Sequence, residues 1–520
     1  MTQVTKPTTI DPVAETVYGR VRGGVEGGVS VFRGVPYAAA PTGALRYRPP
    51  EPPEAWGGVR DATAFGPSAP QLSGGELFDA GVPWGEDCLT LNVWTPAAGG
   101  AARPVIVWIH GGGFLFGTGA DPIVGTGAFA RDGVVFVSIN YRLGGDGFLY
   151  VPDDPDGGNY GVLDQVAALR WVRDNIAAFG GDPARVTLAG QSAGATAVGA
   201  LLAVPAARGL FARAIVQSGY PDPLLSSESA EITTREIYAR LDLPYGDLDA
   251  LRALREREPE RVLRAQMALF GEVLATRDVR RFGAEIAIPG NPFQPVVGGR
   301  VLPERPVQAL EAAEPAPFDL LIGYNADEFG LMYGIGMLAA DDAPGPVAAA
   351  FDRAFAGGGA EALRAYRSAR PDASGLDLLT ALDTDRGYRL PLARIADAHA
   401  ATGAATYAYR FAWRSRAFGG AIGAGHSVEK PFVFDALDLP QSRRFTGDDP
   451  PQRLADAMHR AWVAFAATGD PGHTGIPEWP RYDPAAPTTL AFGERDQVVH
   501  DPEPAERKLW NGLAAVERSG

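Results

Sequence analysis

Short apolar runs alternate along the chain with longer segments in which apolar residues recur every three or four positions. The runs at 104–110 and 134–142 are short and rich in β-branched residues, which favours strands buried on both faces. The segment 159–181 repeats Val, Leu and Ile at helical spacing, with Asn159 placed to cap its start and two glycines to end it. The alternation continues with a strand, a helix and a strand predicted at 185–190, 193–204 and 213–219.

This order of elements is typical of an α/β protein in which helices flank both faces of a central, mostly parallel sheet. Residues 222–290 and 335–415 are rich in Ala, Leu, Arg and Glu, and we interpret them as helical insertions that cover the sheet. Residues 1–14 are polar and are expected to form a loose tail. We therefore expect residues 15–520 to form a single domain that carries both insertions.

The net charge of the chain argues against two classes of binding partner. Lys and Arg number 47 and Asp and Glu number 62, so the formal net charge is −15. An acidic surface repels nucleic acid and anionic lipid, so we expect neither as a partner.

The N-terminus does not resemble a signal peptide, no apolar run is long enough to span a bilayer, and Cys88 is the single cysteine. These features predict a soluble cytoplasmic protein without an intrachain disulfide.

Residues 190–194 read Gly-Gln-Ser-Ala-Gly and lie between a predicted strand and a predicted helix. A serine on such a turn projects its hydroxyl above the sheet, and small neighbours allow the backbone to turn tightly. The N–H groups at the start of the helix can stabilise developing negative charge. The pattern predicts Ser192 as a nucleophile; the alternative is a Ser/Gly-rich turn without chemistry.

The sequence around this serine resembles a known family. Residues 179–194, FGGDPARVTLAGQSAG, are similar to the active-site signature of the type-B carboxylesterases, which include the cholinesterases, and 86–93, EDCLTLNV, resemble their second signature. Weaker matches at 32–37, 159–165 and 469–471 extend the resemblance over nearly the whole chain, in the manner of bacterial para-nitrobenzyl-esterase-like members. It implies the α/β-hydrolase fold, a serine esterase and no cofactor.

A glycine-rich segment, His110-Gly-Gly-Gly-Phe114, follows the strand predicted at 104–110. Backbone N–H groups can meet the oxyanion of a tetrahedral intermediate only where no side chain blocks the approach, which favours glycine. The resemblance implies that Gly112 and Gly113 donate there together with Ala193, whereas the residues alone also fit a flexible loop. We interpret His110 as structural.

A serine nucleophile needs a histidine as general base and a carboxylate to orient it. Five of the six histidines lie downstream of Ser192, where α/β hydrolases place this residue. His426 lies in a loop of small residues, which leaves its imidazole free to reach a serine. The segment resembles the family's histidine loop, which continues into an acidic residue and an aromatic strand, matched here by Glu429 and 432–434.

The acid follows a strand predicted to begin at Leu320, and both Asp327 and Glu328 are available there. Either carboxylate could accept the imidazole proton, so the residues alone do not choose between them. The resemblance implies Glu328.

The resemblance also implies supporting roles for several residues. Ser218 is expected to form a hydrogen bond near the triad. Gln191 replaces a glutamate that many relatives carry, which argues against cationic choline esters. Lys430 stands where an apolar residue is expected. Two structural ion pairs are implied, Arg46–Glu86 and Arg142–Asp164.

These features predict a carboxylesterase that forms an acyl-enzyme on Ser192, with His426 as base and Glu328 as orienting acid. An acyltransferase that uses the same acyl-enzyme is an alternative, and a non-catalytic binding module is a second one. Metal-ligand spacings such as HExxH and CxxC are absent, as is the phosphate-binding GxxxxGK[ST] motif, so neither a metal nor a cofactor is predicted. The expected partner is a small ester, and both its identity and the choice between monomer and homodimer stay open.

Overall fold

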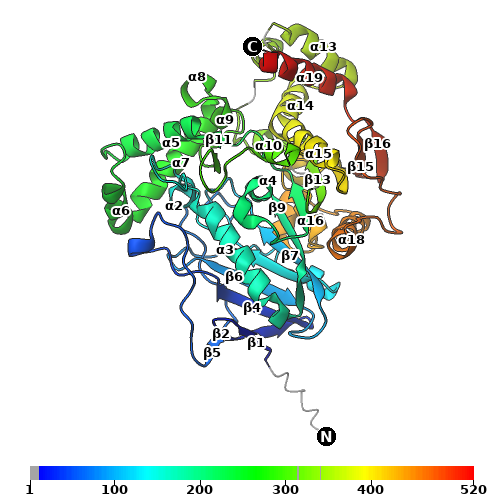
Figure 1. The fold of residues 1–520 in the computed structure, drawn as a ribbon. Helices are drawn as coiled ribbons and strands as arrows, with labels where there is room; N and C mark the ends of the chain where they lie inside the picture. Colours follow the sequence, from blue (N-terminus) through cyan, green and yellow to red (C-terminus); the bar gives the residue numbers. More distant parts are fainter. Residues whose placement is uncertain (1–10, 313–315, 340, 356, 520) are drawn as a thin grey trace.

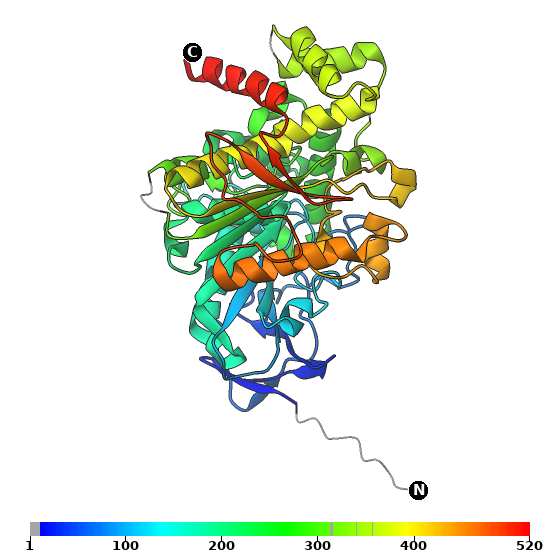
Figure 2. The same ribbon diagram turned by 90° about the vertical axis from the view of Figure 1, so that its right-hand side faces the viewer.

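The computed structural model of the chain describes residues 11–312, 316–339, 341–355 and 357–519. Within them, a large sheet crosses the molecule and helices lie on both of its faces (Figures 1 and 2). The strands of this sheet are β3 (Gly24–Glu26), β4 (Val29–Pro36), β6 (Thr90–Thr95), β7 (Arg103–Ile109), β8 (Val135–Ile139), β9 (Gly181–Gln191), β10 (Arg213–Gln217), β13 (Asp319–Asn325), β14 (Thr406–Phe411), β15 (Thr488–Phe492) and β16 (Gln497–His500).

The order across the described sheet is β16-β15-β14-β13-β10-β9-β7-β8-β6-β4-β3. The seven adjacent strands β15, β14, β13, β10, β9, β7 and β8 pair in parallel. The antiparallel pairs lie towards the two edges of the sheet. The mostly parallel sheet predicted from the alternating pattern is therefore confirmed. Two small sheets accompany it, one of β1 (Val13–Thr16), β2 (Gly19–Arg22) and β5 (Val59–Asp61) and one of β11 (Leu225–Ser226) and β12 (Val296–Val297).

Helices follow most of the inner strands, as expected where parallel strands need crossover connections. The described α-helices are α1 (Ala128–Arg131), α2 (Gly144–Phe148), α3 (Tyr160–Asn175), α4 (Ala193–Ala203), α5 (Ser227–Arg240), α6 (Leu248–Arg257), α7 (Pro259–Thr276), α8 (Val279–Phe282), α9 (Ala284–Ala287), α10 (Pro306–Glu311), α11 (Gly330–Gly334), α12 (Pro344–Ala354), α13 (Gly359–Ala369), α14 (Gly375–Thr384), α15 (Leu390–Ala401), α16 (Lys430–Val433), α17 (Pro440–Thr446), α18 (Gln452–Thr468) and α19 (Pro504–Ser519). No helix in the described ranges is both long and apolar enough to cross a bilayer.

Strand β7 shows how the apolar runs become a two-sided core. Val105, Val107 and Ile109 pack on one face with apolar side chains of α3 and α4. Ile106 and Trp108 point to the other face and pack with α18. Because successive strand residues face opposite sides of a sheet, a strand covered on both faces must be apolar at every position.

The long predicted helix ends earlier than expected, and its start is not capped as expected. Helix α3 runs from Tyr160 to Asn175 and continues as a 3₁₀ turn to Phe179. The Asn159 side chain makes no capping hydrogen bond. Its amide group instead donates to the Asp156 carbonyl and accepts from the Val296 N–H, so this residue ties the helix start to β12.

The two segments interpreted as insertions are mostly helical. Segment 222–290 holds α5 to α9, and 335–415 holds α12 to α15. The second segment also contains β14, a strand of the central sheet, so its helical part stops at Ala401 and the predicted range is too long. At the other end of the chain, residues 1–10 of the expected tail lie outside the described residues, and Val13 already belongs to β1.

The ion pair predicted between Arg142 and Asp164 is present and fully buried. The Arg142 guanidinium donates to both carboxylate oxygens of Asp164, at 2.8 and 2.6 Å, and neither side chain is more than 2% exposed. Burial alone would lower the pKa of Arg142, but the contact with Asp164 raises it above its usual value. Cys88 is a free, buried thiol whose pKa burial also raises.

The second predicted pair belongs to a larger cluster. Arg46 contacts Glu86 at 3.1 Å, and Arg255 of α6 contacts Glu86 at 3.1 Å and Asp146 at 2.8 Å. The Arg255 side chain is fully buried. The sequence reasoning missed Arg255 and Asp146, which attach the first helical insertion to the body of the protein.

Candidate active site

Ser192 lies at the sharp turn between β9 and α4. Its φ is 61°, a left-handed value that is strained for serine and typical of a nucleophile held above the edge of a sheet. A Cβ at Gly194 would lie 2.1 Å from the carbonyl oxygen of Ile109, so only glycine lets α4 approach β7 this closely. The turn therefore places the serine at the carboxyl end of the parallel strands, where the ligand sites of such sheets lie.

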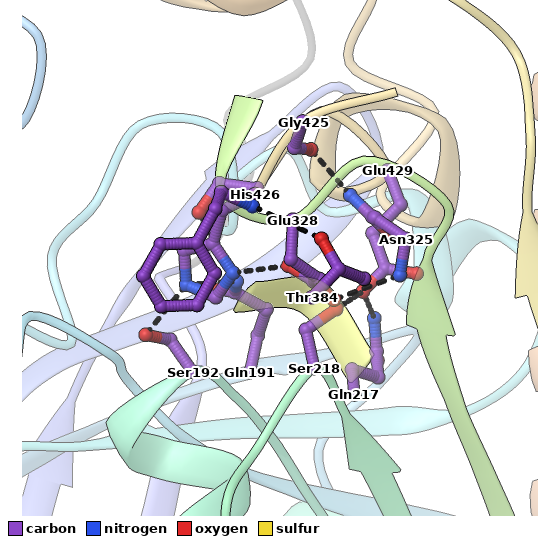
Figure 3. A network of polar contacts seen from close by, with 12 residues as sticks. Gln191, Ser192, Gln217, Ser218, Asn325, Glu328, Thr384, Gly425, His426 and Glu429 are labelled. Carbon is purple, nitrogen blue, oxygen red and sulfur yellow. Dashed lines mark hydrogen bonds and ion pairs between the residues drawn. The ribbon is translucent and has the colours of Figure 1, made fainter. Parts of the chain in front are cut away.

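Three side chains from distant parts of the chain form a continuous hydrogen-bonded line (Figure 3). His426 Nε2 lies 2.7 Å from Ser192 Oγ, and His426 Nδ1 lies 2.6 Å from Glu328 Oε2. The other oxygen of Glu328 accepts the N–H of Asn325 at 2.8 Å, and the Glu328 side chain is fully buried. With Nδ1–H donated to the carboxylate, the Nε2 lone pair can accept the serine proton.

In the structure the carboxyl groups of Asp327 and Glu328, between which the residues alone did not choose, have different partners. Asp327 turns away from the imidazole and accepts hydrogen bonds from Arg414 at 2.8 Å and from the Ala424 N–H at 2.9 Å. Glu328 alone of the two contacts His426.

The other histidines bond elsewhere. Burial lowers the pKa of His110 to about 4, its Nδ1 lies 2.8 Å from the Gly111 carbonyl, and its ring stacks on Tyr141. His110 thus holds the glycine-rich segment. The four remaining histidines form hydrogen bonds away from Ser192: His399 with Thr406, His459 with Val433, His473 with Ala457 and His500 with Thr488.

The backbone conformation of the glycine-rich segment depends on glycine. Gly112 has a φ of 110°, and a Cβ there would lie 2.0 Å from the Phe116 carbonyl oxygen. No described group accepts a hydrogen bond from the N–H of Gly112 or Gly113. Ala193 is the first residue of α4, where N–H groups lack intrahelical partners. These three N–H groups lie on the two segments that flank Ser192.

Gln191 contacts His426 directly. Its Nε2 donates to Ser427 Oγ at 3.0 Å and lies 3.2 Å from His426 Nε2, the same nitrogen that faces Ser192. Gln191 is buried, and its side chain carries no charge.

Ser218 lies near Ser192, His426 and Glu328 but bonds to a different carboxyl. Its Oγ lies 3.3 Å from Glu429 Oε1, which also accepts from Gln217 at 3.3 Å (Figure 3). Tyr409 donates to Glu429 Oε2 at 2.8 Å. Burial, aided by the charge of nearby Glu328, raises the pKa of Glu429 to about 8. In the sequence Glu429 was identified only as a motif match, and no signal pointed to its partners, which lie on β10, just after it and on β14.

The aromatic segment after His426 is not a strand. Residues Lys430–Val433 form α16, a single helical turn, and Phe432 and Phe434 are buried in the core on the α18 side of the sheet. Lys430 reaches back to Asp121 at 2.6 Å. This ion pair explains how a lysine is accommodated where an apolar residue was expected.

A cavity of about 150 Å³ opens above Ser192 and His426. Its walls combine the glycine-rich segment with apolar side chains of α7 and α11 and with Tyr388, which a π-helical turn at Asp385–Arg389 presents. Other lining residues are Phe78, Phe116, Tyr220, Phe270, Leu274, Asn291, Met332 and Met337. Among the residues described, no cluster of His, Cys, Asp and Glu could hold a metal ion.

A sequence model of the carboxylesterase family matches residues 10–510. The chain is 39% identical over 498 residues to phenmedipham hydrolase from Pseudarthrobacter oxydans, which covers 94% of this chain and 96% of that protein. It is 34% identical over 518 residues to para-nitrobenzyl esterase from Bacillus subtilis (strain 168), which covers 95% and 98%.

Solved structures agree with these similarities. A carboxylesterase from Geobacillus stearothermophilus is 40% identical and superimposes with a TM-score of 0.82, over 96% of this chain and 99% of that one. The α/β-hydrolase fold that the resemblance implied is thereby confirmed.

Proposed function

The chain belongs to the carboxylesterase family and is a carboxylic-ester hydrolase, and from this premise we propose that it cleaves esters through an acyl-enzyme on Ser192. The family resemblance predicted from the signatures is confirmed. The observation that carries the proposal is the contact line from Ser192 Oγ through His426 to Glu328, at 2.7 and 2.6 Å.

In the first half of the reaction, His426 Nε2 takes the Ser192 proton as the hydroxyl oxygen attacks the ester carbonyl. Glu328 holds the imidazole in the tautomer with the proton on Nδ1 and stabilises the imidazolium that forms. The alcohol then leaves with the proton that His426 returns, and the acyl group stays on Ser192.

The oxygen of the tetrahedral intermediate would lie among the N–H groups of Gly112, Gly113 and Ala193. Each such donor contributes about 3 kcal/mol to transition-state stabilisation in comparable sites. The unpaired state of the first two N–H groups among the described residues supports this role. In the second half, water attacks the acyl-enzyme with His426 again as base, and the acid is released.

The cavity supports a small ester as substrate. Its apolar walls suit an uncharged group, and Gln191 places a neutral amide beside the triad. Cationic choline esters are therefore not the expected substrates.

Ser192→Ala tests the proposal. Hydrolysis of p-nitrophenyl esters should fall on the order of a millionfold, because a triad acts as a unit. The exposed Ser73→Ala serves as matched control and should keep full activity. Intact mass after treatment with an organophosphate should show a single adduct in the wild type and none in Ser192→Ala. Substantial turnover by Ser192→Ala would contradict the proposal.

The acyltransferase alternative shares every step up to the acyl-enzyme. Product analysis with an added alcohol separates the two, because a hydrolase releases mainly acid and a transferase mainly the new ester.

A further inference from the structure

Tyr220 lies on the cavity wall at the end of β10, close to the glycine-rich segment. It is 8% exposed, and its ring packs edge-on against Tyr388, another residue of the wall. Its hydroxyl makes one hydrogen bond among the described residues, with Asn291 Nδ2 at 2.8 Å. The catalytic steps above make no use of this hydroxyl.

The direction of that hydrogen bond follows from the other bonds of Asn291. Its Oδ1 accepts the Phe293 N–H at 3.0 Å, which identifies the other amide atom as nitrogen. Nδ2 then donates one hydrogen to the Gly113 carbonyl at 3.0 Å and the second to Tyr220 Oη at 2.8 Å. Tyr220 is therefore the acceptor in this pair.

The phenolic proton of Tyr220 consequently has no acceptor among the described residues. Burial raises the pKa of Tyr220 to about 12, so the hydroxyl keeps this proton at neutral pH. A buried hydroxyl without an acceptor is unfavourable, and in a ligand cavity a ligand atom can supply the missing partner. The cavity thus has a fixed hydrogen-bond donor within an otherwise largely apolar wall.

We propose that Tyr220 is a specificity-determining residue that donates its proton to an acceptor oxygen carried by the ester substrate, a few bonds from the scissile carbonyl. The proposal rests on the ester hydrolysis proposed above and names the class of ester: one with an ether, keto or similar oxygen in its acyl or alcohol part. Asn291 aligns the donor, because its two amide hydrogens are both committed.

Pairs of esters that differ by one atom test this. In the acyl series, p-nitrophenyl methoxyacetate, 3-methoxypropanoate and 4-methoxybutanoate are compared with the butanoate, pentanoate and hexanoate, in which CH₂ replaces the ether oxygen. In the alcohol series, esters of 2-methoxyethanol and 3-methoxypropanol are compared with those of butanol and pentanol. The two series show which part of the substrate carries the acceptor.

The measured quantity is the ratio of kcat/KM for ether and alkyl esters, compared between the wild type and Tyr220→Phe. Intrinsic reactivity differences cancel in this double ratio. We expect it to reach about fivefold to tenfold at one ether position, the size of one neutral hydrogen bond. Tyr482→Phe, which removes a hydroxyl bonded to Asp397 away from the cavity, is the control and should leave the ratio unchanged.

Asn291→Asp provides a second test that keeps Tyr220. The introduced carboxylate accepts the phenolic proton, so the ether preference should also disappear in this variant.

A double ratio of one at every position in both series, with alkyl esters still hydrolysed, would overturn the proposal and leave the esterase function standing. An equal loss on ether and alkyl esters would also overturn it, since that pattern means Tyr220 only holds Asn291 and the glycine-rich segment. If the wild type hydrolyses none of the esters, the proposed ester hydrolysis is wrong, and the role proposed for Tyr220, which depends on it, is wrong as well.

Discussion

Two regions of this protein bury carboxyl groups in opposite ways. On α3, Asp164 receives two hydrogen bonds from the guanidinium of Arg142. Behind Ser192, Glu328 and Glu429 receive theirs from a histidine, a backbone N–H, a tyrosine, a glutamine and a serine. The first carboxyl faces a permanent charge, and the other two face groups that are neutral or can titrate.

The different partners of these carboxyls distinguish a structural role from a catalytic one. Arginine stays charged at every accessible pH, so the hydrogen-bonded pair of Arg142 and Asp164 is a permanent structural link. The two carboxyls behind Ser192 have no such permanent partner. Glu328 faces an imidazole that gains a charge in the proposed reaction, and burial raises the pKa of Glu429. In this protein the carboxyl next to arginine therefore has a structural role, whereas Glu328, next to histidine, is the carboxyl that the proposed mechanism uses.

The largest effect is expected from Glu328→Gln. Glutamine keeps the shape of the side chain but cannot compensate the imidazolium, so kcat should fall on the order of 10⁴-fold while the melting temperature stays close to that of the wild type. Asp327→Asn, which alters the neighbouring carboxyl bonded to Arg414, is the control and should change kcat less than about threefold. Retention of a tenth of the activity by Glu328→Gln would remove the distinction between these two carboxyls.

A smaller effect, on stability rather than chemistry, is expected from Asp164→Asn. The change leaves the buried Arg142 without its counter-charge, which should lower the free energy of unfolding by about 3–5 kcal/mol. Asp174→Asn is the matched control, because Asp174 pairs with Arg173 where both side chains are about half exposed, and its cost should stay below about 0.5 kcal/mol. Urea unfolding measures the loss of unfolding free energy in each variant. Equal losses in Asp164→Asn and Asp174→Asn would show that burial of the ion pair is unimportant.

The smallest effect is expected from Glu429→Gln, and it depends on pH. Because burial and Glu328 raise the pKa of Glu429 from 4.5 to about 8, the folded state binds more protons than the unfolded state between these values. Wild-type stability therefore falls as the pH rises through this window. Glutamine does not titrate, so from pH 5.5 to 8 the variant should gain about 3 kcal/mol relative to the wild type.

Urea midpoints for Glu429→Gln and the wild type at pH 5.5, 6.5 and 8 give this difference. A difference that does not change with pH would mean that folding does not shift the titration of Glu429, and the contrast between the two regions would fail.

The sequence predicted those parts of the site that are coded locally. The pentapeptide around Ser192 specifies its own turn, since the small residues and the helix that follows are adjacent in the chain. The alternating pattern likewise predicted the inner strands, because burial on both faces leaves a mark at every position. The choice of Glu328 over Asp327 needed the resemblance, since the reason for it, Arg414, lies 87 positions away from Asp327.

Contacts set by register between distant strands were beyond the reach of the sequence. Tyr409 reaches Glu429 because β14 pairs with β13 in one particular register, and no local pattern encodes that alignment. The same holds for Tyr220 and Asn291, which are 71 positions apart. Location in the cytoplasm and a single domain over residues 15–520 stay predictions.

The ion cluster around Arg255 has a consequence for protein engineering. Helix α6 is anchored to the body by Glu86 and Asp146, and α7, which follows it directly, supplies Phe270 and Leu274 to the cavity wall. A graft that exchanges this insertion with that of a relative, to alter which esters fit, must therefore carry matching counter-ions on both sides of the junction. Without them, the transplanted wall would sit over buried, uncompensated charge, and the chimera would lose stability before its selectivity could be measured.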